Sequence, residues 1–402
     1  MSAAVKLAYL VSHPIQYQAP LLRRIAADPE IELTVFFCSA SSLRAHRDEG
    51  FGRVIEWDVP LLDGYDHRFL PAIGDTGSPS VTRPLNYGLA RALREGGYQA
   101  LWVHGYTRLY HLVSMIGARR RGLVVLNRDE GWAHSAARGP LKRGLLRLAV
   151  AGLRRVCDGW LTIGTANRAH YAALGVPEDR LFTMPYAVDN DRFHAMAEAA
   201  AATRNALRAE LEIAPGRPVV LFASKFQPRK RAADLVAAFA RVAGEAACRA
   251  PYLVLAGDGE ERAALARQVA ALGLDGSVRF AGFRNQSELP RFYDLCDVFV
   301  LPSVLEPWGL VINEAMNAGR AVIASDQVGA AADLVRDGEN GFVVPACDVD
   351  ALADALRAVL SDPEQCRRMG ARSLEIVGGW GFDEDIAGLK RALAQCRAGA
   401  RT

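Results

Sequence analysis

The chain has 402 residues, of which half are hydrophobic and 23% are charged, and this composition excludes an intrinsically disordered protein. The length predicts two domains rather than one. The formal net charge is only +3, so the chain lacks the strongly positive field typical of nucleic-acid-binding proteins, and no nucleic-acid partner is expected.

The seven cysteines are scattered along the chain, and no two of them form a CxxC pair. This pattern indicates thiols in a reducing compartment rather than a disulfide framework or a zinc site. No segment reaches the roughly 18 apolar residues that a membrane span needs. The apolar start of the chain lacks the charged leader and cleavage site of a signal peptide, so it predicts a first buried strand. A soluble, cytoplasmic protein is therefore expected.

In the first half, short apolar β-type runs alternate with helical patterns. The predicted strands are Val5–Val11, Ile31–Cys38, Ala100–His104, Leu123–Asn127 and Gly159–Ile163. The predicted helices are Ala19–Ala27, Leu109–Arg120, Leu141–Val156 and Asn167–Leu174. Strands that are separated by helices predict a parallel sheet covered on both faces.

The same alternation restarts near residue 215. The predicted strands of the second half are Pro218–Phe222, Tyr252–Ala256, Val278–Ala281, Val298–Leu301 and Ala321–Ala324. The stretch before them, residues 195–218, has poor strand formers and is interpreted as a linker plus a helix. In the tail, Ile386, Leu389, Leu393 and Cys396 recur at helical spacing. The chain is thus predicted to be an α/β protein with two similar halves.

The segment Ser303–Gly319, SVLEPWGLVINEAMNAG, predicts a loop that leads from a strand into a helix. The first N–H groups of a helix have no internal partner and attract anions. Two carboxylates, Glu306 in the loop and Glu314 in the helix, can accept hydrogen bonds from hydroxyl groups. The amides expected to hold a diphosphate belong to Gly309, Leu310 and Val311. A nucleotide sugar carries both a diphosphate, which these amides can hold, and hydroxyl groups, which these carboxylates can bond.

This segment, with E-x7-E followed by A-x-x-x-G, resembles the retaining GT-B glycosyltransferases of family four. The resemblance covers most of the chain and is strongest from Lys225 to Ala346. It implies two Rossmann-like α/β/α domains facing a cleft: an acceptor domain at 1–196, a nucleotide-sugar donor domain at 197–378, and a C-terminal helix at 379–402 that packs back on the first domain. It also implies a nucleotide-diphosphate sugar as donor, with a UDP-sugar favoured, and neither a metal nor another cofactor.

A basic loop, Ser224–Arg231, follows the first strand of the second half. Its cations can neutralise a diphosphate, or they can simply be solvated. Lys225 and Lys230 stand at the spacing of the donor-phosphate loop in the resembling family, which favours the first interpretation. Many members have Arg at the first position, and Lys225 keeps the charge but not the bidentate fork. By the same resemblance, Phe283 is expected beside the base of the nucleotide.

Two histidines end strands in the first half. His104 closes the strand ALWVH, at the edge where open α/β sheets bind ligands. The family has a histidine at the matching place that contacts the transferred sugar. The turn after the first strand reads His13-Pro14-Ile15-Gln16-Tyr17 instead of the Gly-rich loop of many relatives, and it resembles a subgroup with HPIQY. His13 and Gln16 are candidates for bonding the donor phosphate or the acceptor.

Two further candidates end the next strand, where Arg128 and Glu130 can either orient acceptor hydroxyls or pair within their own cluster. The following segment, Arg138–Arg155, contains six basic residues and no acid, with Leu141, Leu145, Leu148 and Leu153 on an apolar side. It fits either a peripheral contact with the inner face of a membrane or a core helix with a solvated basic side.

The function predicted by this resemblance is transfer of a sugar to an acceptor hydroxyl of a glycan or a lipid-linked molecule, with retention of configuration. His104, Glu306 and Lys230 are the candidate catalytic residues. Glu306 is expected to hold sugar hydroxyls rather than to act as a covalent nucleophile. The alternatives are a nucleotide-sugar-binding protein without activity and a sugar-nucleotide epimerase. A dinucleotide dehydrogenase is disfavoured because neither half opens with GxGxxG.

Overall fold

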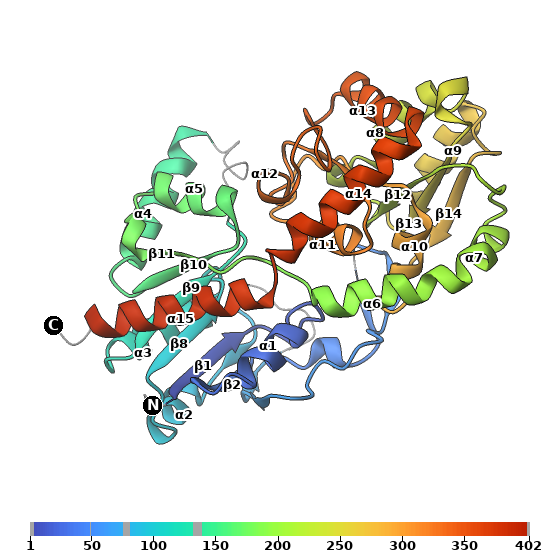
Figure 1. Cartoon of the computed structure of the whole chain (residues 1–402). Helices are drawn as coiled ribbons and strands as arrows, with labels where there is room; N and C mark the ends of the chain where they lie inside the picture. The colour runs from blue at the N-terminus through green and yellow to red at the C-terminus, as the bar shows by residue number, and fades with distance from the viewer. Residues whose placement is uncertain (1–3, 49, 75–80, 132–138, 400–402) are drawn as a thin grey trace. The chain divides into compact units, whose positions relative to one another are not determined.

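The computed structural model describes residues 4–48, 50–74, 81–131 and 139–399. The chain forms two compact units (Figure 1). The first comprises Met1–His46, Val59–Tyr186 and Phe382–Thr402, and the second comprises Arg47–Asp58 and Ala187–Gly381. These limits lie near the predicted boundaries after residues 196 and 378. The assignment of Arg47–Asp58 to the second unit has no counterpart in the sequence analysis.

The first unit contains a seven-stranded parallel sheet with the order β11-β10-β9-β8-β1-β2-β5. Its strands are β1 (Val5–Val11), β2 (Ile31–Phe37), β5 (Asp66–Phe69), β8 (Ala100–His104), β9 (Val124–Arg128), β10 (Gly159–Thr162) and β11 (Leu181–Thr183). Its helices are α1 (Ala19–Ala26), α2 (Leu89–Glu95), α3 (Leu109–Arg119), α4 (Pro140–Leu153), α5 (Thr165–Ala173) and α15 (Phe382–Gly399). The last helix, α15, packs against β9, β10 and β11.

The second unit contains a six-stranded parallel sheet with the order β14-β13-β12-β15-β16-β17. Its strands are β12 (Val219–Ala223), β13 (Tyr252–Ala256), β14 (Val278–Gly282), β15 (Val298–Leu301), β16 (Ala321–Ser325) and β17 (Gly341–Val344). Its helices are α6 (Asn190–Ala200), α7 (Arg204–Glu210), α8 (Ala232–Val242), α9 (Arg262–Ala271), α10 (Leu289–Leu295), α11 (Leu310–Asn317), α12 (Ala331–Leu334), α13 (Val349–Ser361) and α14 (Pro363–Gly378).

Four short strands form two small ribbons outside the main sheets. In the first, β3 (His46–Asp48) pairs with β4 (Arg53–Ile55), and in the second, β6 (Ala72–Ile73) pairs with β7 (Leu85–Asn86). The interpretation of residues 195–218 as a linker plus one helix is incomplete, because α6 and α7 are both helices and α6 packs against α10 and α11.

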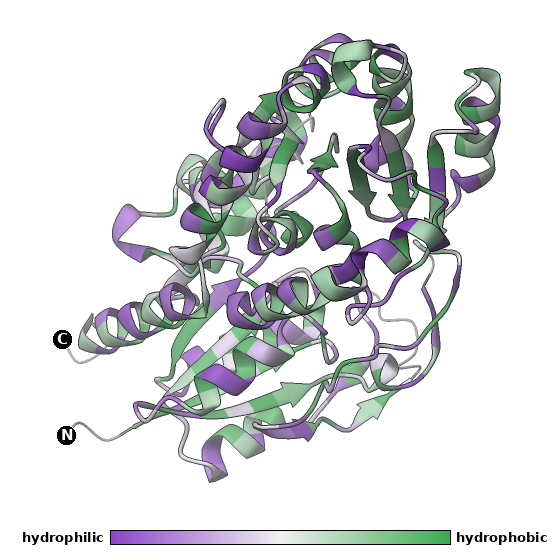
Figure 2. Cartoon of the chain, turned by 45° about the vertical axis from the view of Figure 1, so that its right-hand side comes forward, coloured by the Kyte–Doolittle hydropathy of each residue, from purple (hydrophilic) through white to green (hydrophobic). Residues whose placement is uncertain are grey.

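Continuous aliphatic runs explain the strands. Val219, Val220, Leu221 and Phe222 of β12 are fully buried, as parallel strands covered on both faces require. Figure 2 shows hydrophobic residues concentrated along the strands. A helix such as α13 begins where the side chain of Asp348 accepts a hydrogen bond from the Ala351 amide at 2.9 Å. The predicted fold class, two parallel α/β halves, is confirmed.

Candidate functional site

Both sheets reverse their strand order at one place. In the second unit the reversal lies between β12 and β15, which are neighbours although β13 and β14 separate them in the sequence. Ligands of open α/β sheets bind at the carboxyl ends of the strands at such a reversal. The basic loop follows β12 and the loop with Glu306 follows β15, so the structure brings these two predicted segments to one switch point.

Lys230 and Glu306 form an ion pair across this switch point. The Lys230 ammonium donates to Oε2 of Glu306, and the guanidinium of Arg229 lies 3.9 Å from the same oxygen. Lys230 is only 7% exposed. Burial lowers the pKa of Lys230, and the adjacent Glu306 carboxylate opposes that shift. The ion pair therefore places a poorly solvated ammonium at the switch point, where it attracts an anionic ligand more strongly than a fully solvated one would.

Lys225, the other predicted phosphate ligand, is held by a carboxylate from the β3–β4 ribbon. Its ammonium lies 2.8 and 2.9 Å from the two carboxylate oxygens of Asp48, and 4.7 Å from the ring centre of Phe51. Burial acts to raise the pKa of Asp48, but hydrogen bonds from Lys225 and from the Phe51 amide bring that pKa below its usual value. Asp48 is 177 residues away in sequence, and no motif pointed to it.

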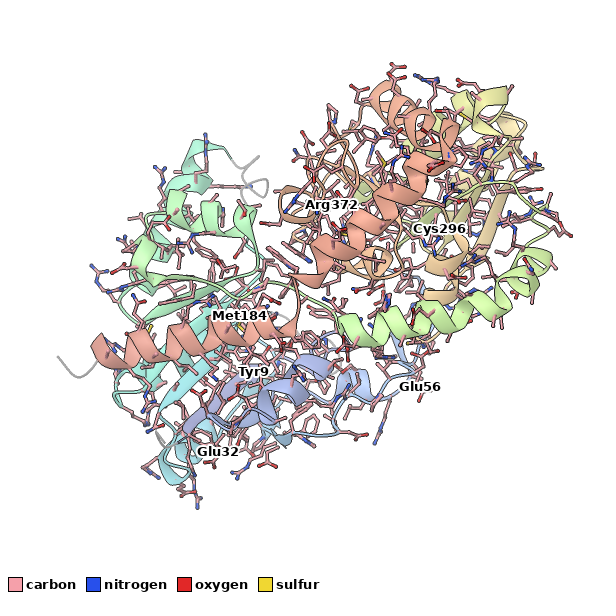
Figure 3. All side chains as sticks on the ribbon, viewed as in Figure 1. Tyr9, Glu32, Glu56, Met184, Cys296 and Arg372 are labelled. Carbon is pink, nitrogen blue, oxygen red and sulfur yellow. The ribbon has the colours of Figure 1, made fainter. Side chains whose placement is uncertain are left out.

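The β3–β4 ribbon also covers Phe283, which follows β14. The rings of Phe51 and Phe283 meet edge to face with centres 4.8 Å apart, and the Arg53 guanidinium lies 5.4 Å from the Phe283 ring centre. The Asn285 side chain donates to the carbonyl of Glu56 at 2.7 Å (Glu56 is labelled in Figure 3). The structure therefore connects Lys225 and Phe283 through one aromatic side chain that sequence reasoning missed.

Helix α11 begins at Gly309, which has a φ of 99°. A Cβ there would lie 3.0 Å from a methyl of Leu301 and 3.2 Å from one of Val328, so both the backbone conformation and the space require glycine. Leu310 and Val311 form the first turn, where main-chain N–H groups have no partner within the helix. The predicted anion-binding amides thus stand at the same switch point as Lys230.

Glu314 lies deeper in α11 than its predicted role suggests. It is only 6% exposed, and one carboxylate oxygen accepts a hydrogen bond of 2.6 Å from the Tyr293 hydroxyl. Burial raises the pKa of Glu314 to about 7, although the Tyr293 bond acts to lower it. The two predicted carboxylates therefore differ: Glu306 is ion-paired, and Glu314 bonds a phenol. Contact of Glu314 with a ligand stays a prediction.

In the first unit the strand order reverses between β1 and β8. His13 follows β1 and His104 ends β8, so the two predicted histidines flank this second switch point. The Tyr9 hydroxyl (Tyr9 is labelled in Figure 3) donates to Gln18 at 2.8 Å, and the Gln18 amide nitrogen lies 3.3 Å from each ring nitrogen of His104. Gln18, which positions His104, was not predicted.

Both histidines are neutral at pH 7. Burial and, to a smaller extent, the nearby Arg128 together lower the pKa of His104 to about 3. Burial lowers the pKa of His13 to about 4, and its Nδ1 lies 2.8 Å from the Ser12 hydroxyl. A neutral imidazole both donates and accepts hydrogen bonds. This switch point is therefore suited to hydroxyl groups, whereas the one in the second unit is suited to anions.

Arg128, at the carboxyl end of β9, is buried in an ion pair. It is 1% exposed, and its guanidinium donates to the carbonyls of Met184 and Pro185 and to Asp385 of α15, at 2.9, 3.1 and 3.0 Å. This burial favours the alternative of an internal ion pair, formed with Asp385 rather than within its own cluster, and orientation of acceptor hydroxyls by Arg128 stays a prediction. Its carboxylate partner lies 257 residues away, beyond the reach of any local motif.

Glu130 and Gln16 remain accessible. Glu130 is exposed and accepts hydrogen bonds from the hydroxyls of Tyr17 and Tyr186 at 3.3 and 3.2 Å. Gln16 is half-buried in the turn after β1. Tyr17 belongs to the HPIQY motif, so this motif connects the first switch point to the end of β9. A role of Glu130 and Gln16 in binding an acceptor stays a prediction.

The basic segment contains helix α4. Arg138 lies outside the described residues. Leu141, Leu145 and Leu148 are 77%, 59% and 71% exposed, whereas Leu153 is buried. The predicted apolar side is therefore divided between solvent and core. Among the described residues, no helix is both long and apolar enough to span a membrane.

No group of three or more His, Cys, Asp or Glu side chains among the described residues is arranged to hold a metal ion. The expected independence from metal stays a prediction, because it concerns the reaction. All seven cysteines are free thiols, as their scattered positions predicted.

Comparison with known proteins identifies the class. Residues 203–375 match the family model for glycosyl transferases group 1. The chain is 31% identical over 313 residues to the GDP-mannose-dependent α-(1-6)-phosphatidylinositol monomannoside mannosyltransferase of Mycobacterium tuberculosis, which covers 73% of this chain and 75% of the relative. The chain belongs to the group 1 glycosyltransferases.

Another relative is the D-inositol 3-phosphate glycosyltransferase of Nocardia farcinica, 34% identical over 220 residues. This match covers 54% of the chain and 47% of the relative, so the chain spans about half the length of that protein. HepE of Anabaena, solved in complex with UDP, superposes with a TM-score of 0.73 at 19% identity, over 97% of this chain and 99% of that one. This likeness establishes the GT-B fold.

Proposed function

We propose that this protein transfers a sugar from a nucleotide-diphosphate sugar to an acceptor hydroxyl with retention of configuration. The observation that carries the proposal is the convergence of Lys230, Glu306 and the start of α11 at one switch point of the second unit. Cations and unpartnered amides stabilise the charge that develops on a departing diphosphate, so no metal is needed for that step. We assign donor binding to the second unit.

In this proposal, different residues of the second unit bind different parts of the donor. Lys230 and the amides of Leu310 and Val311 hold the diphosphate. When Lys230 also binds the diphosphate, Glu306 can accept hydrogen bonds from the sugar. Glu314 binds hydroxyls of the nucleotide sugar. Phe283 lies beside the base. In this proposal the diphosphate replaces Asp48, whose carboxylate holds the ammonium of Lys225 in the structure.

We assign acceptor binding to the first unit, where His104 and His13 are neutral and can bond hydroxyls. His104 contacts the transferred sugar, and Glu130 and Gln16 orient the acceptor. From the HPIQY turn we assign the protein to a subgroup with that motif. The donor phosphate assists in removing the proton from the acceptor hydroxyl. The acceptor oxygen therefore attacks the sugar from the face on which the nucleotide diphosphate departs.

UDP-sugars are our favoured donors, because the structural relative HepE was solved with UDP and with UDP-glucose. The mannosyltransferase relative is named as GDP-mannose-dependent, so GDP-mannose is the competing donor. A thermal-shift series with UDP-glucose, other UDP-sugars and GDP-mannose tests this choice, because a ligand that binds only the folded state raises its melting temperature. A larger shift with GDP-mannose would reverse our choice of base.

Product analysis with a labelled donor tests the reaction itself. A transferase moves the label to an added glycan or lipid-linked acceptor. An epimerase alters the nucleotide sugar without any acceptor, and a binding protein leaves the label unchanged. The second and third outcomes would each replace the proposal by one of the alternatives.

A lipid-linked acceptor fits the surface of α4. Leu141, Leu145 and Leu148 recur on one side of the helix, beside Lys142 and Arg143, which is the composition of an interfacial membrane helix. We propose that this surface contacts anionic lipid. Replacing the three leucines by serine should abolish flotation with phosphatidylglycerol-containing vesicles. Leu272→Ser, at an exposed leucine of the second unit, is the matched control. Equal flotation of all variants would exclude the contact.

A further inference from the structure

A second basic cavity lies at the opposite edge of the second sheet. Its volume is about 160 Å³. The side chains that matter here belong to Arg204, Arg208, Arg217, Arg249, Arg320, Asp294 and Asp297. Arg217 precedes β12 and Asp297 precedes β15, whereas Lys225, Lys230 and Glu306 follow these strands. A five-residue strand rises about 16 Å, so the cavity is separate from the proposed donor site.

The cavity carries an excess of positive charge. It is lined by five arginines but only two aspartates. Asp294, which is 3% exposed, is held by both prongs of Arg204 at 2.8 and 2.5 Å, with Arg320 at 3.5 Å. Arg204 and Arg320 therefore both form ion pairs with the Asp294 carboxylate. The other three arginines form no ion pair with any described residue.

Two of these three arginines are oriented by neutral oxygens. Arg208 donates to the carbonyls of Ala214 and Arg217, at 3.0 and 2.5 Å. Arg217 donates to the carbonyl of Ala250 and to the Tyr252 hydroxyl, and its guanidinium lies 4.3 Å from the centre of that ring. Bonds to neutral acceptors fix the guanidinium groups but leave their charge uncompensated.

Arg249 is the least constrained of the five. It is exposed, and its side chain forms no hydrogen bond with any described residue. Its φ is 57°, followed by 47° at Ala250, and such backbone is unfavourable for residues other than glycine, by about 1–3 kcal/mol. Arg217 bonds the carbonyl of Ala250 and so stabilises this turn. The strained turn holds a free guanidinium at the rim of the cavity.

We propose that this cavity binds a phosphate group, either as inorganic phosphate or as the head of a phosphomonoester. Guanidinium groups match phosphate oxygens in two-pronged geometry and keep their charge at every physiological pH. The volume suits one such group and falls below the roughly 300 Å³ at which pockets for drug-sized ligands begin. Arg249 and Arg217 bind the anion, and Arg208 adds charge from behind. The site is independent of the proposed donor chemistry.

Calorimetric titration of inorganic phosphate at constant ionic strength tests the proposal. We expect saturable binding to the wild-type protein that weakens by about tenfold or more in Arg249→Gln and in Arg217→Gln. Arg267→Gln removes an exposed charge elsewhere in the same unit and should leave binding unchanged. Lys230→Ala should also leave it unchanged, because that lysine belongs to the other edge of the sheet.

A parallel titration with a hexose phosphate distinguishes the two sources. If the hexose phosphate binds more tightly than inorganic phosphate, the ligand is a phosphorylated metabolite. If it binds equally or more weakly, the ligand is free phosphate. Absence of saturable binding, or equal loss in Arg267→Gln, overturns the proposal. Loss in Lys230→Ala alone would assign the phosphate to the switch point instead. Arg249 is exposed and not hydrogen-bonded, so its variant tests the site without disturbing the fold.

Discussion

The two sheets share one topology and carry opposite chemistry at their switch points. In both, the first strand of the sheet lies beside one that comes much later in the chain, β1 beside β8 and β12 beside β15. The second unit places the Lys230–Glu306 ion pair there, whereas the first places two neutral histidines. Arg128, which acts on His104 in the first unit, is buried in an ion pair. Topology therefore determines where a ligand binds, and the loop residues determine which one.

The largest expected effect tests whether Arg128 stabilises the fold rather than binds a ligand. Arg128→Met leaves Asp385 buried without its partner, which should lower the free energy of unfolding by about 3–5 kcal/mol. Urea unfolding followed by tryptophan fluorescence measures the loss. In Arg128→Met with Asp385→Leu much of it should return, because no charge stays buried. A stable single variant with impaired acceptor binding would support a role in orienting acceptor hydroxyls instead.

Lys230 should behave in the opposite way. Lys230→Ala removes the buried cation that faces the diphosphate, and we expect the transfer rate to fall by about 10²–10³-fold with the fold intact. Initial rates with labelled donor measure the effect. Lys230→Ala with Glu306→Gln should stay inactive, which separates loss of the cation from an unpaired carboxylate. Arg229→Gln, at a more exposed neighbour, should cost much less.

Glu314 should show its burial in the pH dependence of stability. Its pKa is raised from 4.5 to about 7, so the folded state favours the protonated carboxyl. Relative to Glu314→Gln, the wild-type protein therefore loses stability as the pH rises from about 4.5 through 7, by on the order of 3 kcal/mol. Thermal unfolding at pH 4.5 and pH 8 measures the difference.

At pH 8 the same substitution, Glu314→Gln, should also weaken nucleotide-sugar binding, as should Glu314→Ala. A variant that binds donor like the wild type would limit Glu314 to the contact with Tyr293. A melting difference that does not change with pH would show that the carboxyl titrates normally.

The smallest expected effect concerns Asp48. If the diphosphate must displace Asp48 from Lys225, Asp48→Asn should tighten UDP binding by about two- to fivefold. The effect should vanish in a Lys225→Ala background. Asp58→Asn, in the same segment but bonded to Ser287, is the control. Weaker binding in Asp48→Asn would mean that the carboxylate positions Lys225 for the donor.

Much of the fold could be predicted from the sequence because parallel strands are continuous apolar runs. Each of the ten predicted strands has a counterpart, and the loop from β15 into α11 forms as SVLEPWGLVINEAMNAG predicted. The short exposed strand β5 was missed because DHRF has no apolar pattern. The edge strand β17 was also missed, and residues 195–218 were interpreted as a linker plus one helix because their alanine-rich composition gives no clear period.

The partners of the site residues could not be predicted. Asp48, Tyr293, Gln18 and Asp385 each bond a predicted residue from another element, and no local spacing encodes those contacts. Arg128 shows the consequence: a polar cluster at a strand end allowed either a binding role or an ion pair, and the carboxylate that pairs with it lies in a helix 257 residues later.

The sequence by itself determined the strands, the glycine that starts α11 and the positions of the charged loops, because these depend on local periodicity and backbone stereochemistry. Only the tertiary structure decided which charges are exposed and which are neutralised. Burial and ion pairing depend on segments far apart in the chain, and they set the chemistry of Lys230, Glu314 and Arg128 more than residue type does.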